Sequence, residues 1–473
     1  MSFYQTPISL PGRFRRVLDS FLRKAGLPFA GVLSQQQVEE AFDEQGARFA
    51  NGEDGVYTPT VTLWAFLLQV LFKDEHRSCV AAVARVAILL TALGRKPCSS
   101  NTGAYCRARA KLPEQVIQRL TTEVAEGCQR KVPKGWLWHG RHVKLVDGTT
   151  VSMPDTPENQ AVYPQNPAQE EGLGFPIARM VVLLSLATAM VTGMAMGPYS
   201  GKETGEPALL RQLLDTLEEG EVLLGDRYYC SYFMIALVRE LGVDVVVRLH
   251  QNRPADFRRG KRLGKEDHLV EWLRPVKPDW MDRETYDRMP KSISLRELRV
   301  HVDQPGFRTE SLVVVTSLGD ARQYPAEEIA ELYHRRWLVE LDIRAIKITL
   351  GMDVLRCKTP EMVRREVWTC LLAYNLIRQT MLEAARKSGS SPRQLSFTAA
   401  MQTIGASWFV VLLDASAVAR LVEMQLSHLA AHKVGNRPNR VEPRAVKRRP
   451  KQHRLLTKPR HEARANLLAG LSP

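Results

Sequence analysis

The chain has 473 residues, a formal net charge of +15 at pH 7 and an isoelectric point near 9.6. A chain of this length can bury a large core and divide into roughly two to four domains of about 150 residues. The excess of 66 Lys and Arg over 51 Asp and Glu favours a polyanionic partner, nucleic acid before an acidic membrane.

The cysteines and the uncharged stretches narrow the class of protein further. Seven cysteines form no Cys-x2-Cys pair, so neither a disulfide framework nor a structural zinc site is indicated, and a cytoplasmic protein is expected. The opening MSFYQTPISLPGRFRR places charge where a signal peptide needs its apolar segment, which argues against secretion. The uncharged stretch from Met180 to Gly201 is long enough for a membrane span, but its Val- and Leu-rich start predicts two buried strands joined by a tight turn.

Residues 1–138 are predicted to form a helical N-terminal region that binds DNA. The segments LSQQQVEEAF, Val61 to Phe72 and SCVAAVARVAILLTAL have apolar residues three and four apart, as on one face of a helix. Beyond them, SSNTGAYCRARAK predicts a capped helix carrying Arg107 and Arg109, which would contact DNA. A solvated basic helix is the alternative.

Near residue 140 the helical spacing of apolar residues gives way to short apolar runs typical of strands. VKLVDGTTVSM, ARMVVLLSLAT and VTGMAMGPY predict three strands, and GEPALLRQLLDTLEEG predicts a helix. The strand EVLLGDRYY, the helix SYFMIALVREL and the strand DVVVRLH follow. Three strands, a helix and then alternating strands and helices are the order of an RNase H-like α/β domain with a mixed sheet, whose first part we assign to residues 139–250.

The second half of the chain is predicted to complete this domain. Residues 251–322 are polar with two strands near ELRVHV and ESLVVVTS, which predicts a β-rich insertion subdomain. Residues 323–390 form the remainder of the catalytic domain, with a long helix from Pro325 to Gly351 and a second helix over EMVRREVWTCLLAYNLIRQTMLEAARK. Residues 391–473 form a C-terminal helical region and a basic tail.

Most of the excess charge lies in that tail. Between His432 and Arg464 there are twelve Lys or Arg against two Glu, a net charge of +10. Four prolines prevent a long helix there, so the tail, with Lys447, Arg448 and Arg449 at its centre, is expected to lie along DNA phosphates. A tail that serves only solubility is the alternative.

Two aspartates follow apolar strand-like runs. Asp147 ends VKLVD and Asp226 ends VLLGD, so neighbouring strands would bring both carboxylates to one sheet edge. Clustered carboxylates raise one another's pKa unless a cation lies between them, which predicts hard metal ions such as Mg²⁺. Taken singly, an Asp beside Gly is more often a turn residue.

A third carboxylate is predicted from the long helix. In YHRRWLVELDIRAIK, the residues Tyr333, Arg336, Glu340 and Lys347 stand at offsets 0, 3, 7 and 14. At about 100° per residue they fall within one arc of about 60°. Glu340 could then hold metal while Arg336 and Lys347 take neighbouring phosphates, although a charge-rich helix also shows such stripes by chance.

The spacing Tyr-x2-Arg-x3-Glu-x6-Lys resembles the signature of bacterial insertion-sequence transposases of the DDE type, in the group named after insertion sequence four. VDGT around Asp147 and LLGDRYY around Asp226 resemble that group's two Asp motifs, and RPNRVEPRAVKRRPK resembles its basic C-terminal segment. The resemblance covers roughly residues 140 to 460.

The resemblance implies that the chain binds the terminal inverted repeats of an insertion sequence, cleaves at the element ends and joins 3′-hydroxyls to target DNA. It implies that Asp147, Asp226 and Glu340 bind two Mg²⁺ ions, for which Mn²⁺ substitutes, without a nucleotide. It implies that Tyr333, Arg336 and Lys347 hold the transposon end. In related enzymes a tryptophan of the β-rich insertion stacks on a flipped base, a role open here to Trp272 or Trp280, although a buried structural tryptophan is the commoner use.

The expected partners are double-stranded transposon ends and target DNA, a second copy of the chain assembled on DNA, and no membrane; the expected location is the bacterial cytoplasm, associated with the nucleoid. No GxSxG or HExxH motif is present, and GPYSGKE lacks the spacing of a phosphate-binding loop. The alternatives are an RNase H-like nuclease or resolvase without strand transfer and a catalytically silent DNA-binding regulator.

Overall fold

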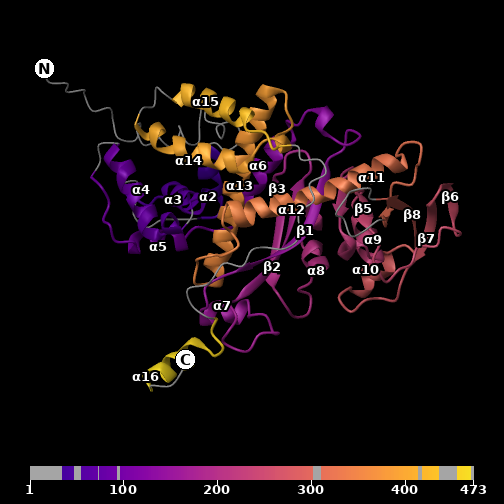
Figure 1. The fold of residues 1–473 in the computed structure, drawn as a ribbon, viewed down its shortest axis with the longest axis horizontal. Coiled ribbons are helices and arrows are strands. Elements are labelled where there is room, and N and C mark those ends of the chain that lie inside the picture. The colour runs from indigo at the N-terminus through magenta and orange to yellow at the C-terminus, as the bar shows by residue number, and fades with distance from the viewer. Residues whose placement is uncertain are drawn as a thin grey trace.

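The computed structural model describes residues 35–46, 55–72, 74–92, 96–301, 311–413, 418–435 and 455–469. A large mixed sheet crosses the molecule, with the N-terminal helices gathered beyond one end of it and the strands of residues 261–316 at the other (Figure 1). The predicted helical start of residues 1–34 and the tail residues Lys447, Arg448 and Arg449 lie outside the described residues.

The sheet has nine strands in the order β3-β2-β1-β4-β5-β9-β8-β7-β6. β1, β4 and β5 run parallel to one another, and the remaining neighbours pair antiparallel. The strands are β1 Val143–Ser152, β2 Ile177–Ser185, β3 Val191–Pro198, β4 Val222–Gly225, β5 Asp244–Arg248, β6 Lys261–Gly264, β7 Asp267–Leu273, β8 Ser292–His301 and β9 Ser311–Thr316.

The uncharged stretch after Met180 forms most of β2 and the edge strand β3, two strands joined by a tight turn as the sequence predicted. Met180 and Val182 of β2 belong to the hydrophobic core on one side of the sheet, while Val181 and Leu183 belong to the core on the other side. Successive side chains of a strand point to opposite faces, so a strand covered on both faces is apolar throughout. No helix among the described residues is long and apolar enough to cross a membrane.

The segment of residues 251–322 contains four strands where the sequence predicted two. β9 pairs antiparallel with β5, and β8, β7 and β6 follow outward, so these strands extend the central sheet. The pairing of Val246 with Thr316 covers an edge of β5 that would otherwise expose unpaired backbone groups. The segment is therefore β-rich, as predicted, but its described strands continue the main sheet and form no sheet of their own.

Some of the described helices lie along the sheet, and the N-terminal helices form a separate group beyond one edge of it (Figure 1). They are α2 Gln35–Glu44, α3 Pro59–Leu71, α4 Cys79–Ala92, α5 Gly103–Ala110, α6 Glu114–Gln129, α7 Pro157–Val162, α8 Glu206–Arg211, α9 Tyr232–Glu240, α10 Arg283–Arg288, α11 Ala326–His334, α12 Leu338–Arg344, α13 Pro360–Ser388, α14 Phe397–Leu413, α15 Val418–Ala431 and α16 Arg460–Leu468. The helix predicted over residues 205–220 is shorter, because α8 ends at Arg211.

The long helix α13 joins the N-terminal helices to the rest of the protein. The side chain of Thr359 caps its first turn, and Gly389 ends it with a left-handed backbone at φ 62°. α13 contacts α3 and α6 of the N-terminal group as well as α14 and α15. Its middle is buried nearly all round, which explains why its apolar residues occupy more than one face.

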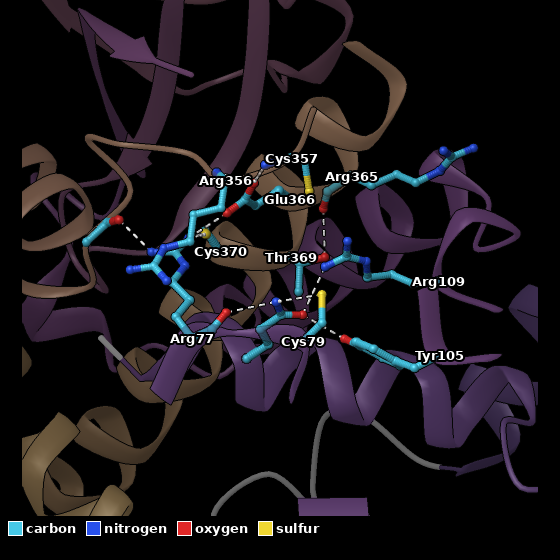
Figure 2. A network of polar contacts seen from close by, with 12 residues as sticks. Arg77, Cys79, Tyr105, Arg109, Arg356, Cys357, Arg365, Glu366, Thr369 and Cys370 are labelled. Carbon is cyan, nitrogen blue, oxygen red and sulfur yellow. Dashed lines mark hydrogen bonds and ion pairs between the residues drawn. The ribbon is translucent and has the colours of Figure 1, made fainter. Parts of the chain in front are cut away.

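A buried polar network ties the same two parts together (Figure 2). Arg77 donates to the Gly351 carbonyl at 2.5 Å and to Glu366 of α13 at 3.1 Å. Glu366 in turn accepts from the backbone N–H groups of Arg356 and Cys357, each at 2.9 Å. Because Gly351 ends the helical segment that carries Glu340, the network fixes the end of that segment against the N-terminal helices.

Candidate active site

The first two predicted carboxylates lie side by side across parallel strands. Leu145 of β1 is in register with Leu224 of β4, so Asp147 and Asp226, each two residues further on, emerge at the same level. β4 ends at Gly225, while β1 continues to Ser152 through its pairing with β2. Asp147 therefore lies within its strand and does not end it, contrary to the prediction, and the end of β4 opens the space beside it.

Backbone donors hold both aspartate side chains. The Gly148 N–H donates to Asp147 Oδ1 at 2.8 Å. The Tyr228 N–H donates to Asp226 Oδ1 at 2.7 Å, so Asp226 caps the short 3₁₀ turn Arg227–Tyr229.

The third predicted carboxylate lies on a helical segment that crosses the sheet. α12 contacts β1 and α11 contacts β5, and the two helices follow one another through a 3₁₀ turn (Figure 1). Arg336 lies between the carboxylates, with Nη2 3.0 Å from Glu340 Oε1 and Nη1 3.9 Å from Asp147 Oδ2. The structure therefore brings Asp147, Arg336 and Glu340 together.

The other two signature residues lie on the same segment but differ in environment. Tyr333 is only 7% exposed, and burial raises the pKa of its hydroxyl to about 12, although the charges of Arg336 and Arg248 oppose this. Lys347 is half-buried, and burial lowers the pKa of its ammonium group. A π-helical turn over Ala345–Thr349 widens the helix there, so Lys347 departs from the ideal stripe.

Several acidic side chains influence Asp147. Burial raises the pKa of Asp147 to about 6, against the Gly148 hydrogen bond and the charge of Arg336, which favour the carboxylate. The negative charges of Glu206 and Asp226 raise the pKa of Asp147 further. Such a group of carboxylates is stabilised by a bound cation.

Glu206 is a site residue that the sequence patterns did not single out. It is the first residue of α8, and Tyr229 Oη donates to Glu206 Oε2 at 3.2 Å. Burial raises the pKa of Glu206, while the Tyr229 hydrogen bond opposes the shift. No motif spacing links Glu206 to the two aspartates, because the loop after β3 brings it there.

Two exposed aromatic side chains also flank the site. Tyr228 follows Asp226 by two residues and is 59% exposed, and Trp337 precedes Glu340 by three residues and is 46% exposed. Large exposed aromatic rings beside carboxylates offer flat faces on which bases can stack. Because each of these aromatic residues lies within three positions of a motif acid, the sequence could have indicated that both lie near the site.

The two predicted tryptophans have protein partners. Trp272 is 3% exposed, its Nε1 donates to Glu297 at 2.9 Å, and Arg253 covers its ring at 3.8 Å. This burial argues against Trp272 as a base-stacking residue. Trp280 is half-buried, with the Arg211 guanidinium 3.8 Å from its ring centroid.

The two predicted arginines of the N-terminal region point in different directions. Arg107 is exposed. Arg109 turns into the buried network drawn in Figure 2, where its Nη1 donates to Gln69 at 3.0 Å and its guanidinium lies 4.9 Å from the Phe66 ring centroid. The structure therefore offers Arg107 to a partner, whereas the position of Arg109 argues against a contact with DNA.

Known proteins resemble the chain over most of its length. The Transposase DDE domain family model matches residues 138–376. Transposase InsG for insertion sequence element IS4, from Escherichia coli strain K12, is 28% identical over 394 residues, which cover 82% of this chain and 85% of the relative. The transposase for insertion sequence element IS421 of Escherichia coli is 38% identical over 66 residues, 14% of this chain and 18% of the relative.

A solved piggyBac transposase synaptic complex with hairpin DNA shares 10% identity, with a TM-score of 0.42 over 89% of this chain and 88% of that one. The family match spans both aspartates, Glu340 and the strands that place them. Because that match covers half of the chain and the IS4 transposase aligns with most of it, the chain belongs to the DDE transposases of insertion sequences, in the IS4 group.

Proposed function

We propose that this transposase binds the terminal inverted repeats of its insertion sequence, cleaves DNA at the element ends and joins the freed 3′-hydroxyls to target DNA. In this reaction water attacks a phosphodiester at the element end and leaves a 3′-hydroxyl. That hydroxyl then attacks a target phosphodiester, so one phosphodiester replaces another and no nucleotide is consumed. The observation that carries the proposal is the placement of Asp147 beside Asp226, with Arg336 and Glu340 above them.

Asp147, Asp226 and Glu340 are the proposed ligands of the divalent metal on which this family depends. Carboxylate oxygens are the donors that Mg²⁺ prefers, and the acidic side chains that influence Asp147 fit a cation. Two Mg²⁺ ions, with Mn²⁺ as a substitute, would activate an attacking oxygen and stabilise a leaving oxygen.

In the structure, the proposed ligand side chains are hydrogen-bonded or paired with other groups of the protein. Among the residues that the structure describes, no group of three or more His, Cys, Asp or Glu is already arranged to hold a metal ion. Glu340 is paired with Arg336, and Asp226 accepts from the Tyr228 N–H. We therefore infer that Glu340 leaves Arg336 when metal binds, which frees the guanidinium for a DNA phosphate.

An RNase H-like catalytic domain is the proposed fold of the site. The order β3-β2-β1-β4-β5, with three antiparallel strands followed by parallel β4 and β5, supports it. We propose the domain layout predicted from the sequence, with residues 1–138 as the N-terminal DNA-binding region, 139–250 and 323–390 as the catalytic domain, 251–322 as the β-rich insertion, and 391–473 as the C-terminal region and tail.

The DNA contacts proposed at the cleaved end are made by the signature helix. Arg336 and Lys347 would take phosphates on either side of the cleaved bond, and Tyr333, which is buried, would support Arg336 from below. Trp280 and Arg107 remain proposed contacts to the bases and the backbone, respectively. Lys447, Arg448 and Arg449 are proposed to bind phosphates away from the site, and a dimer assembled on DNA would hold both ends.

The test is an assay of labelled element ends with a supercoiled target, in Mg²⁺ or EDTA. Joined products should require metal and should fall more than about 100-fold in Asp226→Asn and Glu340→Gln, because both remove a proposed metal ligand. Glu331→Gln is the matched control, since Glu331 is an exposed acid on the same helical segment that pairs with Arg335. Its products should match the wild type.

Each other outcome selects a different function. Cleavage without joining would favour an RNase H-like nuclease or resolvase, and tight DNA binding with neither would favour a catalytically silent regulator. Nicking that survives Glu340→Gln would show that Glu340 is not a metal ligand.

A further inference from the structure

Two histidines stand side by side at the end of α15. His428 lies in the last turn of that helix, which ends at Ala431, and His432 is the next residue. Both side chains are exposed, and the centroids of the two imidazole rings lie 4.2 Å apart. Residues four apart on a helix are neighbours on one face, so both rings meet the solvent together. The end of α15 therefore presents a pair of imidazoles to the surface.

Hydrogen bonds determine which nitrogen of each ring stays free. His432 Nδ1 lies 2.8 Å from the carbonyl oxygen of His428. Because a carbonyl only accepts, Nδ1 carries the proton and the neutral ring keeps its lone pair on Nε2. His428 Nδ1 lies 3.1 Å from Thr403 Oγ1 of α14, and a hydroxyl oxygen is able to accept in the same way. Neither Nε2 atom has a hydrogen-bond partner within the part of the chain that the structure describes.

Histidines that bind metals in proteins show this arrangement. Such a histidine coordinates the ion through one ring nitrogen and donates from the other to a carbonyl or another acceptor, which fixes the tautomer and the orientation of the ring. The His428 carbonyl and the Thr403 hydroxyl supply these outer contacts here, from two different helices. Two histidines at i and i+4 on one helical face also have the spacing with which helices hold zinc. The spacing and the outer contacts are separate observations that point to the same ligand.

We propose that His428 and His432 form a second metal site, which takes a late first-row divalent ion of the class of Zn²⁺, Ni²⁺ and Cu²⁺ through the two Nε2 atoms. Imidazole nitrogen suits these ions, whereas Mg²⁺ prefers oxygen, so the site differs in chemistry from the carboxylates of Asp147 and Asp226. Among the described residues no third His, Cys, Asp or Glu is arranged to join the pair, so water completes the coordination. The inference does not depend on the proposed function.

A bound ion would hold the root of the basic tail. Helix ends fray, and a chelate between residues four apart closes the last turn of α15. His432 is the first residue of the basic tail, and Lys433 pairs with Leu395 through an isolated β-bridge. Thr403 joins the same site to α14. The ion would therefore fix the point at which the tail leaves the helices.

Titration calorimetry tests the site without relying on activity. The full-length protein would be titrated with Zn²⁺ and with Ni²⁺ in excess Mg²⁺, which occupies the proposed carboxylate site. His428→Gln and His432→Gln should each weaken Zn²⁺ binding by about tenfold or more, because each removes one of two ligands. His461→Gln is the matched control, since His461 is an exposed histidine of α16. Its Zn²⁺ affinity should match that of the wild type.

Two further measurements separate a metal site from a simple helix cap. Thr403→Val removes the outer contact of His428 and should weaken Zn²⁺ binding by less than the loss of a ligand. Zn²⁺ should slow hydrogen exchange of the backbone amides of residues 428–434 in the wild type and leave it unaltered in His432→Gln.

Zn²⁺ affinity that is unchanged in both histidine variants would assign the ion to other donors, such as cysteine thiols, and would overturn the proposal. So would hydrogen exchange of residues 428–434 that Zn²⁺ does not slow in the wild type. Strand transfer in Asp226→Asn has no bearing on either result, so this proposal and the proposed function fail separately.

Discussion

Gly225, which precedes Asp226, determines how closely β1 and the Tyr229 ring can approach. A Cβ at this position would lie 2.8 Å from Val146 Cγ1 and 3.0 Å from Tyr229 Cδ2. Both neighbours are fully buried, so neither can move into solvent to relieve the contact. At this position the motif glycine is required for packing, while the aspartate beside it is a proposed metal ligand.

Gly225→Ala should therefore lower the free energy of unfolding by about 1–3 kcal/mol, the usual cost of overpacking a core. Urea unfolding followed by circular dichroism measures it. Gly135→Ala is the control, because no atom lies within 4 Å of a Cβ built there and its φ is not positive. Equal stabilities of the two variants would contradict the packing derived for Gly225.

At the scale of the element, the helical segment that carries Glu340 is held by a second acid. Asp342 lies two residues further on and is 2% exposed. Its carboxylate lies 2.8 Å from Arg378 Nη2 on α13 and 2.9 Å from Arg393 Nη1. Glu340 is thus free to exchange partners while Asp342 fixes α12 against α13.

Asp342→Ala should destabilise the protein by about 3–5 kcal/mol, because it leaves the buried guanidinium of Arg378 and the half-buried guanidinium of Arg393 without their counter-charge. The midpoint of urea unfolding reports this loss. Glu383→Ala removes an acid of α13 that pairs with Arg386 near the surface, and it should cost less than about 1 kcal/mol. A mild effect of Asp342→Ala would mean that α12 is held mainly by its apolar contacts.

At the scale of the whole molecule, charge is distributed unevenly along the chain. The tail from His432 to Arg464 has a net charge of +10 out of +15, whereas the site itself is rich in carboxylates. Basic residues outside the motifs could bring DNA to the site without pairing with the proposed metal ligands. Most of the DNA affinity is then expected to depend on salt.

Replacing Lys447, Arg448 and Arg449 together by Ala should reduce the slope of log K against log salt by up to about 2.7, at about 0.9 per phosphate contact. The loss should be the same on element ends and on random duplexes, because phosphate contacts do not read sequence. Fluorescence anisotropy in EDTA measures both. Arg283→Ala, which removes an exposed arginine paired with Asp287, should leave the slope unchanged. An unchanged slope in the triple variant would assign the tail to solubility.

Local patterns were sufficient for much of the fold. Period-two and period-3.6 apolar patterns predicted the three strands after residue 140, two of which lie in or overlap the uncharged stretch, and the long helix α13. The single helix predicted from Pro325 to Gly351 is divided in the structure into α11, a 3₁₀ turn, the short helix α12 and a π-helical turn. The patterns missed β6, which is short and largely exposed, and β7, whose apolar and polar residues do not alternate. β7 pairs with the open edge of β8, and β6 pairs with β7, so both strands depend on the assembled sheet.

For the site, the sequence by itself determined which residues carry the signature. Asp147 and Asp226 each stand in a short motif, and Arg336 and Glu340 share a third motif with a fixed spacing. Only the tertiary structure decided which other side chains join or leave that group. It brought Glu206 against Gly148, turned Arg109 inward and buried Trp272 against Glu297. The physical reason is that burial and contact depend on elements distant in the chain, whereas spacing reports only the orientation of residues within one element.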